Sequence, residues 1–167
     1  MNEEFGITKT VGPLGITFYT PGSKDEAVRA LQEIVCDPKT SEKPTIHFLN
    51  AWSLVCASKN PELLQVFLST KAINFVDSFW LAKSLAWKHK REILQCPGPE
   101  IFRLSLGTFE NSQHYFLGGT DASVLKIIEL VNTKSRVVGY DPSLIDIRDL
   151  SSLEKKSSRL AELSPSI

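Results

Sequence analysis

Short apolar segments alternate along this chain with longer segments in which apolar residues recur at helical spacing. Apolar runs of strand length predict buried strands. We predict them at residues 45–49, 73–76, 114–117 and 136–138, after a first strand or hairpin arm at residues 14–19. Alternating strands and helices favour a parallel sheet with right-handed crossovers. The pattern therefore predicts an α/β fold, Rossmann-like, with three α/β/α layers and a mostly parallel sheet.

The segments between these strands carry helix signals. Ser23 with Glu26 three residues later forms a capping box, and Asn60-Pro61-Glu62 combines an N-cap, a first-turn proline and a first-turn acid. We predict helices from Ser23 to about Cys36, after Asp121, and at residues 51–58, 62–68, 79–87, 101–106 and 149–163. One domain is expected over residues 1–145, followed by a C-terminal helix and tail over residues 146–167.

Composition narrows the class of protein. The chain has 167 residues with 42% hydrophobic, enough for one domain with a substantial core. Lys+Arg and Asp+Glu are both 19, so no overall field attracts nucleic acid, and nucleic acid is not an expected partner. The three cysteines form no CxxC pair and suit free thiols in a cytosol. No apolar run reaches the roughly 18 residues that cross a bilayer, so we expect a cytoplasmic protein, at most peripheral at the inner face of the plasma membrane.

A polar residue or a glycine directly follows each of the four predicted strands. These are Asn50, Asp77, the pair Gly118-Gly119, and Gly139. Ligands of open α/β sheets bind outside the carboxyl ends of the strands, and all four ends are expected along one edge of one sheet. A single cleft would then hold a carboxylate, an amide and a glycine turn, which favours a nucleotide-type site. The alternative is that Asp77 only caps the following helix.

The glycine turn itself is a weak signal. Gly118 and Gly119 lie between a strand and a helix that begins near Thr120, where backbone N–H groups can face a phosphate. The turn matches neither the dinucleotide nor the P-loop fingerprint, so a plain tight turn stays open. The basic run of residues 88–91 is most simply a solvated helix end, and secondarily a phosphate patch.

Seven segments over about residues 14 to 140 carry, in order and spacing, the motifs of one family. They are Leu14–Thr17, Ile46–Leu54, Asn60–Glu62, Phe75–Ser78, Gly98–Phe102, Phe116–Gly119 and Val137–Gly139. In this order they resemble the WecG/TagA/CpsF glycosyltransferase family. Such enzymes transfer a sugar, N-acetylmannosamine in the best-known cases, from a UDP donor to a lipid-diphosphate-linked sugar in bacterial surface-polymer synthesis.

The resemblance assigns roles to particular residues. It implies that Asp77 is the general base of an inverting transfer, which needs one carboxylate to take the acceptor's proton. It also implies substrate binding near Asn50, Trp52, Ser78 and Gly98, and nucleotide binding near Gly118, Gly119, Thr120 and Gly139. The chain has no DxD triplet, which fits the family's metal independence, so no metal site is predicted. No cofactor is expected beyond the UDP-sugar, which is the donor substrate.

The sequence also departs from the family. Ser78 replaces the usual glycine after the aspartate, Trp52 stands where a histidine is common, and the family's basic C-terminal segment, which reaches the membrane, has no counterpart after Gly139. A weak or inactive transferase that does not bind membranes is therefore expected. The leucine face of residues 149–163 is expected to cover the sheet or to pair with a second copy as a homo-oligomer. The alternatives are a non-catalytic nucleotide-sugar-binding or partner-binding module, and a structural α/β domain.

Overall fold

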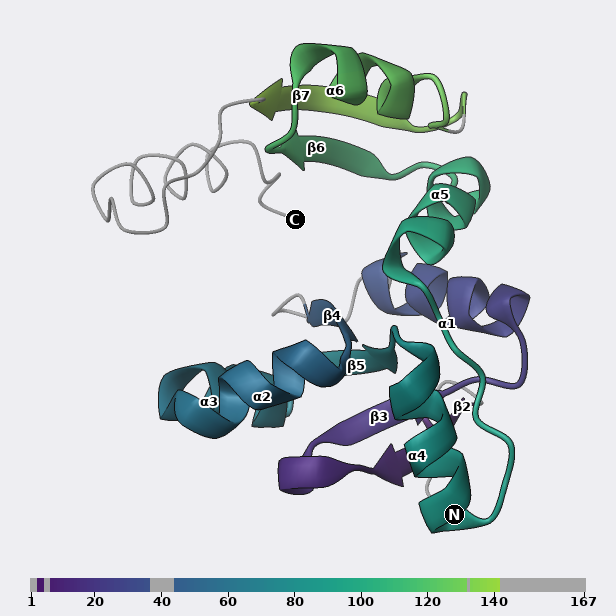
Figure 1. Cartoon of the computed structure of the whole chain (residues 1–167). Coiled ribbons are helices and arrows are strands. Elements are labelled where there is room, and N and C mark those ends of the chain that lie inside the picture. The colour runs from purple at the N-terminus through teal and green to yellow at the C-terminus, as the bar shows by residue number, and fades with distance from the viewer. Residues whose placement is uncertain (1–2, 5–6, 37–43, 132, 142–167) are drawn as a thin grey trace. The chain divides into compact units, whose positions relative to one another are not determined.

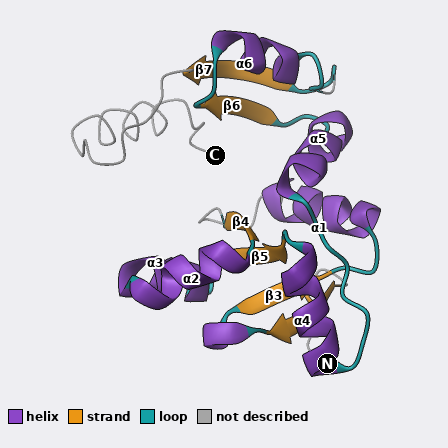
Figure 2. Ribbon diagram, viewed as in Figure 1, coloured by secondary structure: helices purple, strands orange, loops and turns teal. Residues whose placement is uncertain are grey.

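The structure is a computed structural model that describes residues 3–4, 7–36, 44–131 and 133–141. The chain divides into two compact units, the first over residues 1–108 and the second beginning at Phe109 (Figure 1). Each unit has its own sheet, packed with helices in the first unit and with one described helix in the second (Figure 2). The predicted boundary between residues 145 and 146 and the predicted helix over residues 149–163 lie outside the described residues.

The first unit is built on a sheet with strand order β1-β2-β3-β5-β4. Its strands are β1 (Glu3–Glu4), β2 (Ile7–Val11), β3 (Thr17–Thr20), β4 (Thr45–Leu49) and β5 (Ala72–Val76). Its helices are the 3-10 turn η1 (Pro13–Gly15) and α1 (Lys24–Cys36), α2 (Ala51–Lys59), α3 (Pro61–Leu68), α4 (Phe79–His89) and α5 (Gly98–Thr108). Strands β1 to β3 pair antiparallel, whereas β5 runs parallel to both β3 and β4.

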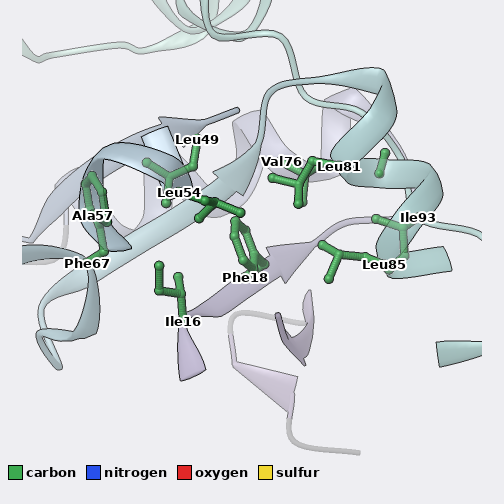
Figure 3. Close-up of a cluster of buried hydrophobic side chains, with 11 residues drawn as sticks. Ile16, Phe18, Leu49, Leu54, Ala57, Phe67, Val76, Leu81, Leu85 and Ile93 are labelled. Atoms are coloured by element: carbon green, nitrogen blue, oxygen red, sulfur yellow. The ribbon is translucent and has the colours of Figure 1, made fainter. Parts of the chain in front are cut away.

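Helices cover both faces of this sheet, as the three-layer prediction requires. Phe18, Leu49 and Val76 point to the face covered by α2, α3 and α4, where they join a buried cluster with Leu81 and Leu85 (Figure 3). The alternating residues Tyr19, Phe48 and Phe75 lie on the opposite face, because successive side chains of a strand point to opposite sides. There the Phe48 ring stacks on Phe75, and the Tyr19 ring is tilted against Phe75. Helices α1 and α5 pack together on that opposite face (Figure 1).

Local capping explains where several helices begin. The Asn60 side chain accepts a hydrogen bond from the backbone N–H of Leu63, and Pro61 opens α3 as predicted. Ser23 Oγ accepts from the N–H of Glu26 at the start of α1. The Glu26 carboxylate, however, accepts from the N–H of Gly22, one residue earlier than a standard capping box would have it.

The second unit contains β6 (Gln113–Leu117), α6 (Asp121–Ile128) and β7 (Arg136–Asp141). β6 and β7 pair parallel with each other as a separate two-stranded sheet, with a register shift between His114 and Tyr115. The prediction that all four strand ends lie along one sheet edge is therefore wrong. Among the strand pairings of the described residues three are parallel and two antiparallel, so the α/β class with a mostly parallel sheet is confirmed. Within the same residues, no helix is long and apolar enough to cross a membrane.

Candidate functional site

The carboxyl ends of β4 and β5 bring Asn50 and Asp77 to the same level of the sheet. The parallel register pairs Leu49 with Val76, so the next residue of each strand stands side by side with the other. The backbone N–H of Asp77 donates to the carbonyl of Leu49 at 2.8 Å, which extends the ladder by one bond. The predicted carboxylate and amide therefore belong to one edge of the first unit's sheet.

Asp77 is held by the loop that leads into α5, 21 residues along the chain. Its Oδ1 accepts a hydrogen bond from the N–H of Gly98 at 2.8 Å, and its backbone carbonyl accepts from Gln95 Nε2 at 2.6 Å. The N–H of Cys96 donates to the carbonyl of Val76 at 2.7 Å, so residues 95–98 run along the end of β5. No residue of the described segments donates to Asp77 Oδ2. The half-buried carboxylate thus has one oxygen fixed and one oxygen available to accept a proton.

Asp77 is not the cap of the following helix. Ser78 takes that role, because its hydroxyl accepts from the N–H of Leu81 at the start of α4. The capping alternative for Asp77 is therefore wrong for α4. The carboxylate does meet a helix N-terminus, that of α5, through the N–H of Gly98.

Asn50 caps α2 and keeps its amide nitrogen available. Its Oδ1 accepts from both the N–H and the hydroxyl of Ser53, and the backbone N–H of Asn50 donates back to Ser53 Oγ. Within the described chain Nδ2 donates no hydrogen bond. The capping box therefore fixes the side chain with a donor left for a ligand.

Gly98 is required by close packing. A Cβ atom at this position would lie 3.0 Å from Cγ of the Phe48 ring, which itself stacks on Phe75. Glycine therefore allows the first turn of α5 to rest on Phe48 and its N–H to reach Asp77. The predicted substrate-binding residue Gly98 lies at the site, where its visible role is to hold the carboxylate.

Three helices begin at this edge of the sheet. Helix α2 follows Asn50, which stands beside Asp77 in the strand register, and α4 follows Ser78, the next residue after Asp77. Helix α5 begins at Gly98, whose N–H donates to Asp77. Helix N-termini carry a partial positive charge and unpaired N–H groups, which favour anions. The site is therefore suited to an anionic ligand. Trp52, the second residue of α2, exposes 70% of its surface close to this edge.

The other four predicted site residues belong to the second unit. Gly118 and Gly119 form the turn between β6 and α6 with φ angles of +90° and +84°, a region that favours glycine. The N–H of Gly118 donates to the carbonyl of Asp141, and Thr120 caps α6 through the N–H of Ser123. Both groups therefore have structural partners inside the unit.

Gly139 lies inside β7, because the strand continues to Asp141 and does not end at residue 138 as predicted. A Cβ atom there would lie 3.1 Å from the ring of Tyr115, at the register shift between β6 and β7. The position thus allows a close approach of the Tyr115 ring within the sheet.

The sequence indicated no role at the site for two residues near Asp77. Gln95 positions the strand end through the Asp77 carbonyl, and nothing in its local sequence distinguishes it. Cys96 is fully buried, and burial raises the pKa of its thiol to about 12, which removes it as a nucleophile at neutral pH. Among the described residues no group of three His, Cys, Asp or Glu side chains is arranged to hold a metal ion.

The fold and this site together define an α/β protein with a carboxylate among helix N-termini at the carboxyl edge of a sheet. Comparison with family models matches residues 12–163 to the Glycosyl transferase WecG/TagA/CpsF family. The chain belongs to this family, as the seven segments predicted, and it is a glycosyltransferase-family protein of the kind that acts in cell-surface polysaccharide synthesis. No curated protein and no solved structure gave a match.

Proposed function

We propose that this chain transfers a hexosamine or hexose from a UDP-sugar to a lipid-diphosphate-linked sugar, with inversion and without a metal ion. The observation that carries the proposal is the Asp77 carboxylate at the end of β5. One of its oxygens is fixed by Gly98, and the other has no donor among the described residues. The family supports the glycosyltransferase class. The donor, the acceptor and the stereochemistry are what the resemblance to the family implies, and they form part of the proposal.

The proposed role of Asp77 is general base. As the acceptor hydroxyl attacks the anomeric carbon of the donor, Oδ2 takes the hydroxyl proton while UDP leaves from the opposite face. The anomeric configuration is inverted because the nucleophile and the leaving group occupy opposite faces. The bond from the Gly98 N–H to Oδ1 keeps the carboxylate oriented, which is the requirement for a base that acts at one position.

Negative charge develops on UDP as it leaves, so the site must supply donors. The N-termini of α2, α4 and α5 and the amide nitrogen of Asn50 are the proposed groups in the first unit. In the second unit, the turn at Gly118, Gly119 and Thr120 remains a separate candidate for the diphosphate, through the N–H of Gly119 and the start of α6.

The test measures UDP released from a UDP-sugar in the presence of a lipid-diphosphate-linked acceptor. Asp77→Asn keeps the size of the side chain and removes the base, so turnover is expected to fall by about 100-fold or more. Asp25→Asn, an exposed acid in the first turn of α1, is the matched control and is expected to retain turnover. Equal turnover in the two variants would remove Asp77 from the mechanism.

A second measurement separates catalysis from binding. UDP at about 100 times its dissociation constant is expected to add roughly 2.7 kcal/mol to the free energy of unfolding, seen as a thermal shift. A shift with UDP but no turnover with any acceptor would favour the non-catalytic nucleotide-sugar-binding module. Tight binding of NAD or ATP with none of UDP would contradict both versions of the proposal.

A further inference from the structure

Helix α4 presents an unusual outer face. Leu81, Ala82 and Leu85 enter the core of the first unit, while Trp80 and Trp87 expose 77% and 86% of their surfaces. The two tryptophans are seven residues apart, which is close to two full turns, so they lie on the same side of the helix. Tryptophan side chains are buried on average, so two exposed indole rings on one helix face indicate a surface that binds a partner.

The same face is positively charged. Lys83 lies between the two tryptophans in the helical pattern, with its Nζ 5.4 Å from the ring centroid of Phe79, and the exposed Lys90, the C-cap residue of α4, follows Lys83 by seven residues. Residues 79–89 contain no carboxylate. The chain as a whole has 19 basic and 19 acidic residues, so this concentration of positive charge is local. We call the surface formed by Phe79, Trp80, Lys83, Trp87 and Lys90 the aromatic-basic face.

Contacts at the far end hold the helix against the sheet. Arg91, just after α4, donates to the hydroxyls of Thr10 and Thr20, and Lys88 donates to the carbonyl of Val11 at 3.3 Å. The aromatic-basic face is therefore carried on a helix that is anchored at both its apolar side and its C-terminal end. Such a rigid presentation lowers the entropic cost of binding a partner.

We propose that the aromatic-basic face binds the surface of an anionic lipid bilayer, with α4 lying along that surface. Indole rings favour the boundary between water and hydrocarbon because they combine an apolar body with a polar N–H. Lysines can extend past an apolar surface to reach lipid headgroups, and each one near an anionic membrane adds to the affinity. The alternation of tryptophan and lysine on one helix face provides both interactions at once.

Two other occupants fit the face less well. A symmetric dimer would bring the same face of two copies together, so Lys83 and Lys90 would meet the like charges of the second copy. Single-stranded nucleic acid is bound in a basic groove with bases stacked on aromatic rings, whereas this face is the convex side of a single helix. An anionic bilayer is broad, flat and complementary in charge.

The position of the face connects it to the candidate site. Trp80 follows Asp77 by three residues, so the aromatic-basic face starts where the carboxylate stands. If the proposed transferase function holds, the helix would keep the site near the membrane that carries the lipid-linked acceptor. Membrane binding itself does not depend on that function. It differs from the expectation, drawn from residues after Gly139, that the chain does not bind membranes.

The experiment is co-sedimentation of the full chain with vesicles of phosphatidylcholine alone or mixed equally with phosphatidylglycerol. We expect binding to the mixed vesicles that weakens as salt is raised. Lys83→Glu with Lys90→Glu is expected to lower the partition coefficient by at least about tenfold, since each lysine near the surface contributes roughly 1 kcal/mol. Lys59→Glu with Lys126→Glu makes the same change in net charge at exposed sites elsewhere and is expected to bind nearly as the parent chain does.

Fluorescence identifies the part of the chain that enters the interface. Trp52→Phe leaves Trp80 and Trp87 as the only tryptophans, and their emission should shift to the blue on mixed vesicles. Far-UV circular dichroism checks that each variant is folded.

Equal losses in the two lysine pairs, or binding to an oligonucleotide without binding to vesicles, would overturn the proposal. Self-association that disappears in Trp80→Ala with Trp87→Ala, without vesicle binding, would assign the face to a second copy. Vesicle binding without any transferase activity would refute the proposed function and leave this inference standing.

Discussion

Asn74 is the polar residue whose removal should reveal most about what holds the first unit together. It lies in the middle of β5 with 1% of its surface exposed. Its Nδ2 donates to the carbonyl of Phe67 at 2.9 Å and to the carbonyl of Thr17 at 3.1 Å. Phe67 is in the last turn of α3, where carbonyls have no partner within the helix. One amide therefore links a helix end, β3 and β5.

The cost of Asn74→Ala can be estimated from these bonds. Each hydrogen bond contributes roughly 1 kcal/mol net, and a buried carbonyl left without a donor costs about 1–3 kcal/mol. Asn74 Oδ1 has no partner within the described chain, so its removal returns part of this loss. We expect the free energy of unfolding to fall by about 2–4 kcal/mol. Asn60→Ala, which removes an exposed cap, should cost only about 1 kcal/mol and serves as the control.

Urea unfolding followed by far-UV circular dichroism measures both variants. Amide exchange in β5 and α3 assigns the transition to the first unit. Asn74→Leu separates two causes of the loss, because leucine fills the space but donates no hydrogen bond. A loss in Asn74→Ala no larger than in Asn60→Ala, or full recovery in Asn74→Leu, would show that the two carbonyl contacts are not what the asparagine contributes.

Three further predictions follow from the site and its surroundings. Gly98→Ala places a Cβ against Phe48, which should displace the N–H from Asp77 and lower turnover by about tenfold or more; steady-state kinetics with unchanged turnover would contradict this. Cys96 should resist alkylation by iodoacetamide at neutral pH, whereas the partly exposed Cys56 should react, as peptide mass mapping would show. Burial lowers the pKa of His47 in the folded chain below its usual 6.5, so the unfolded chain takes up the proton first and stability should fall as pH drops below about 6.5. His47→Gln should reduce that slope in urea titrations, and an unchanged slope would exclude the histidine as its source.

Local signals in the sequence predicted most of the elements correctly. The strand at residues 45–49 and the helix start at Asn60 and Pro61 agree with β4 and α3, because capping and apolar runs depend on neighbouring residues. The prediction was less accurate where neighbouring residues favour different local structures. Residues 14–19 were expected to be a strand, but Pro13–Gly15 forms a 3-10 turn with Leu14 at a φ of 58°, and β3 starts only at Thr17.

Part of the candidate site was predictable because it too depends on neighbouring residues. Asp77 and Asn50 stand directly after apolar runs, and that position in the sequence is enough to place them at strand ends. The contact between Asp77 and Gly98 was not predictable, since it depends on how the segment before α5 passes along β5. The role of Asn74 could not be predicted from its apolar run, because its amide donates hydrogen bonds to residues 7 and 57 positions away.

The sequence by itself determined the family, the α/β alternation and the polar strand ends, since each of these is encoded in short segments. Only the tertiary structure decided which strands pair. β5 lies between β3 and β4, whereas β6 pairs with β7 in a second unit, so Gly118, Gly119 and Gly139 do not share a sheet edge with Asp77. Tertiary packing also decided that Trp80 and Trp87 face outward while Leu81 and Leu85 enter the core. The physical reason is that strand pairing and burial depend on contacts between distant residues, whose free energies no local pattern contains.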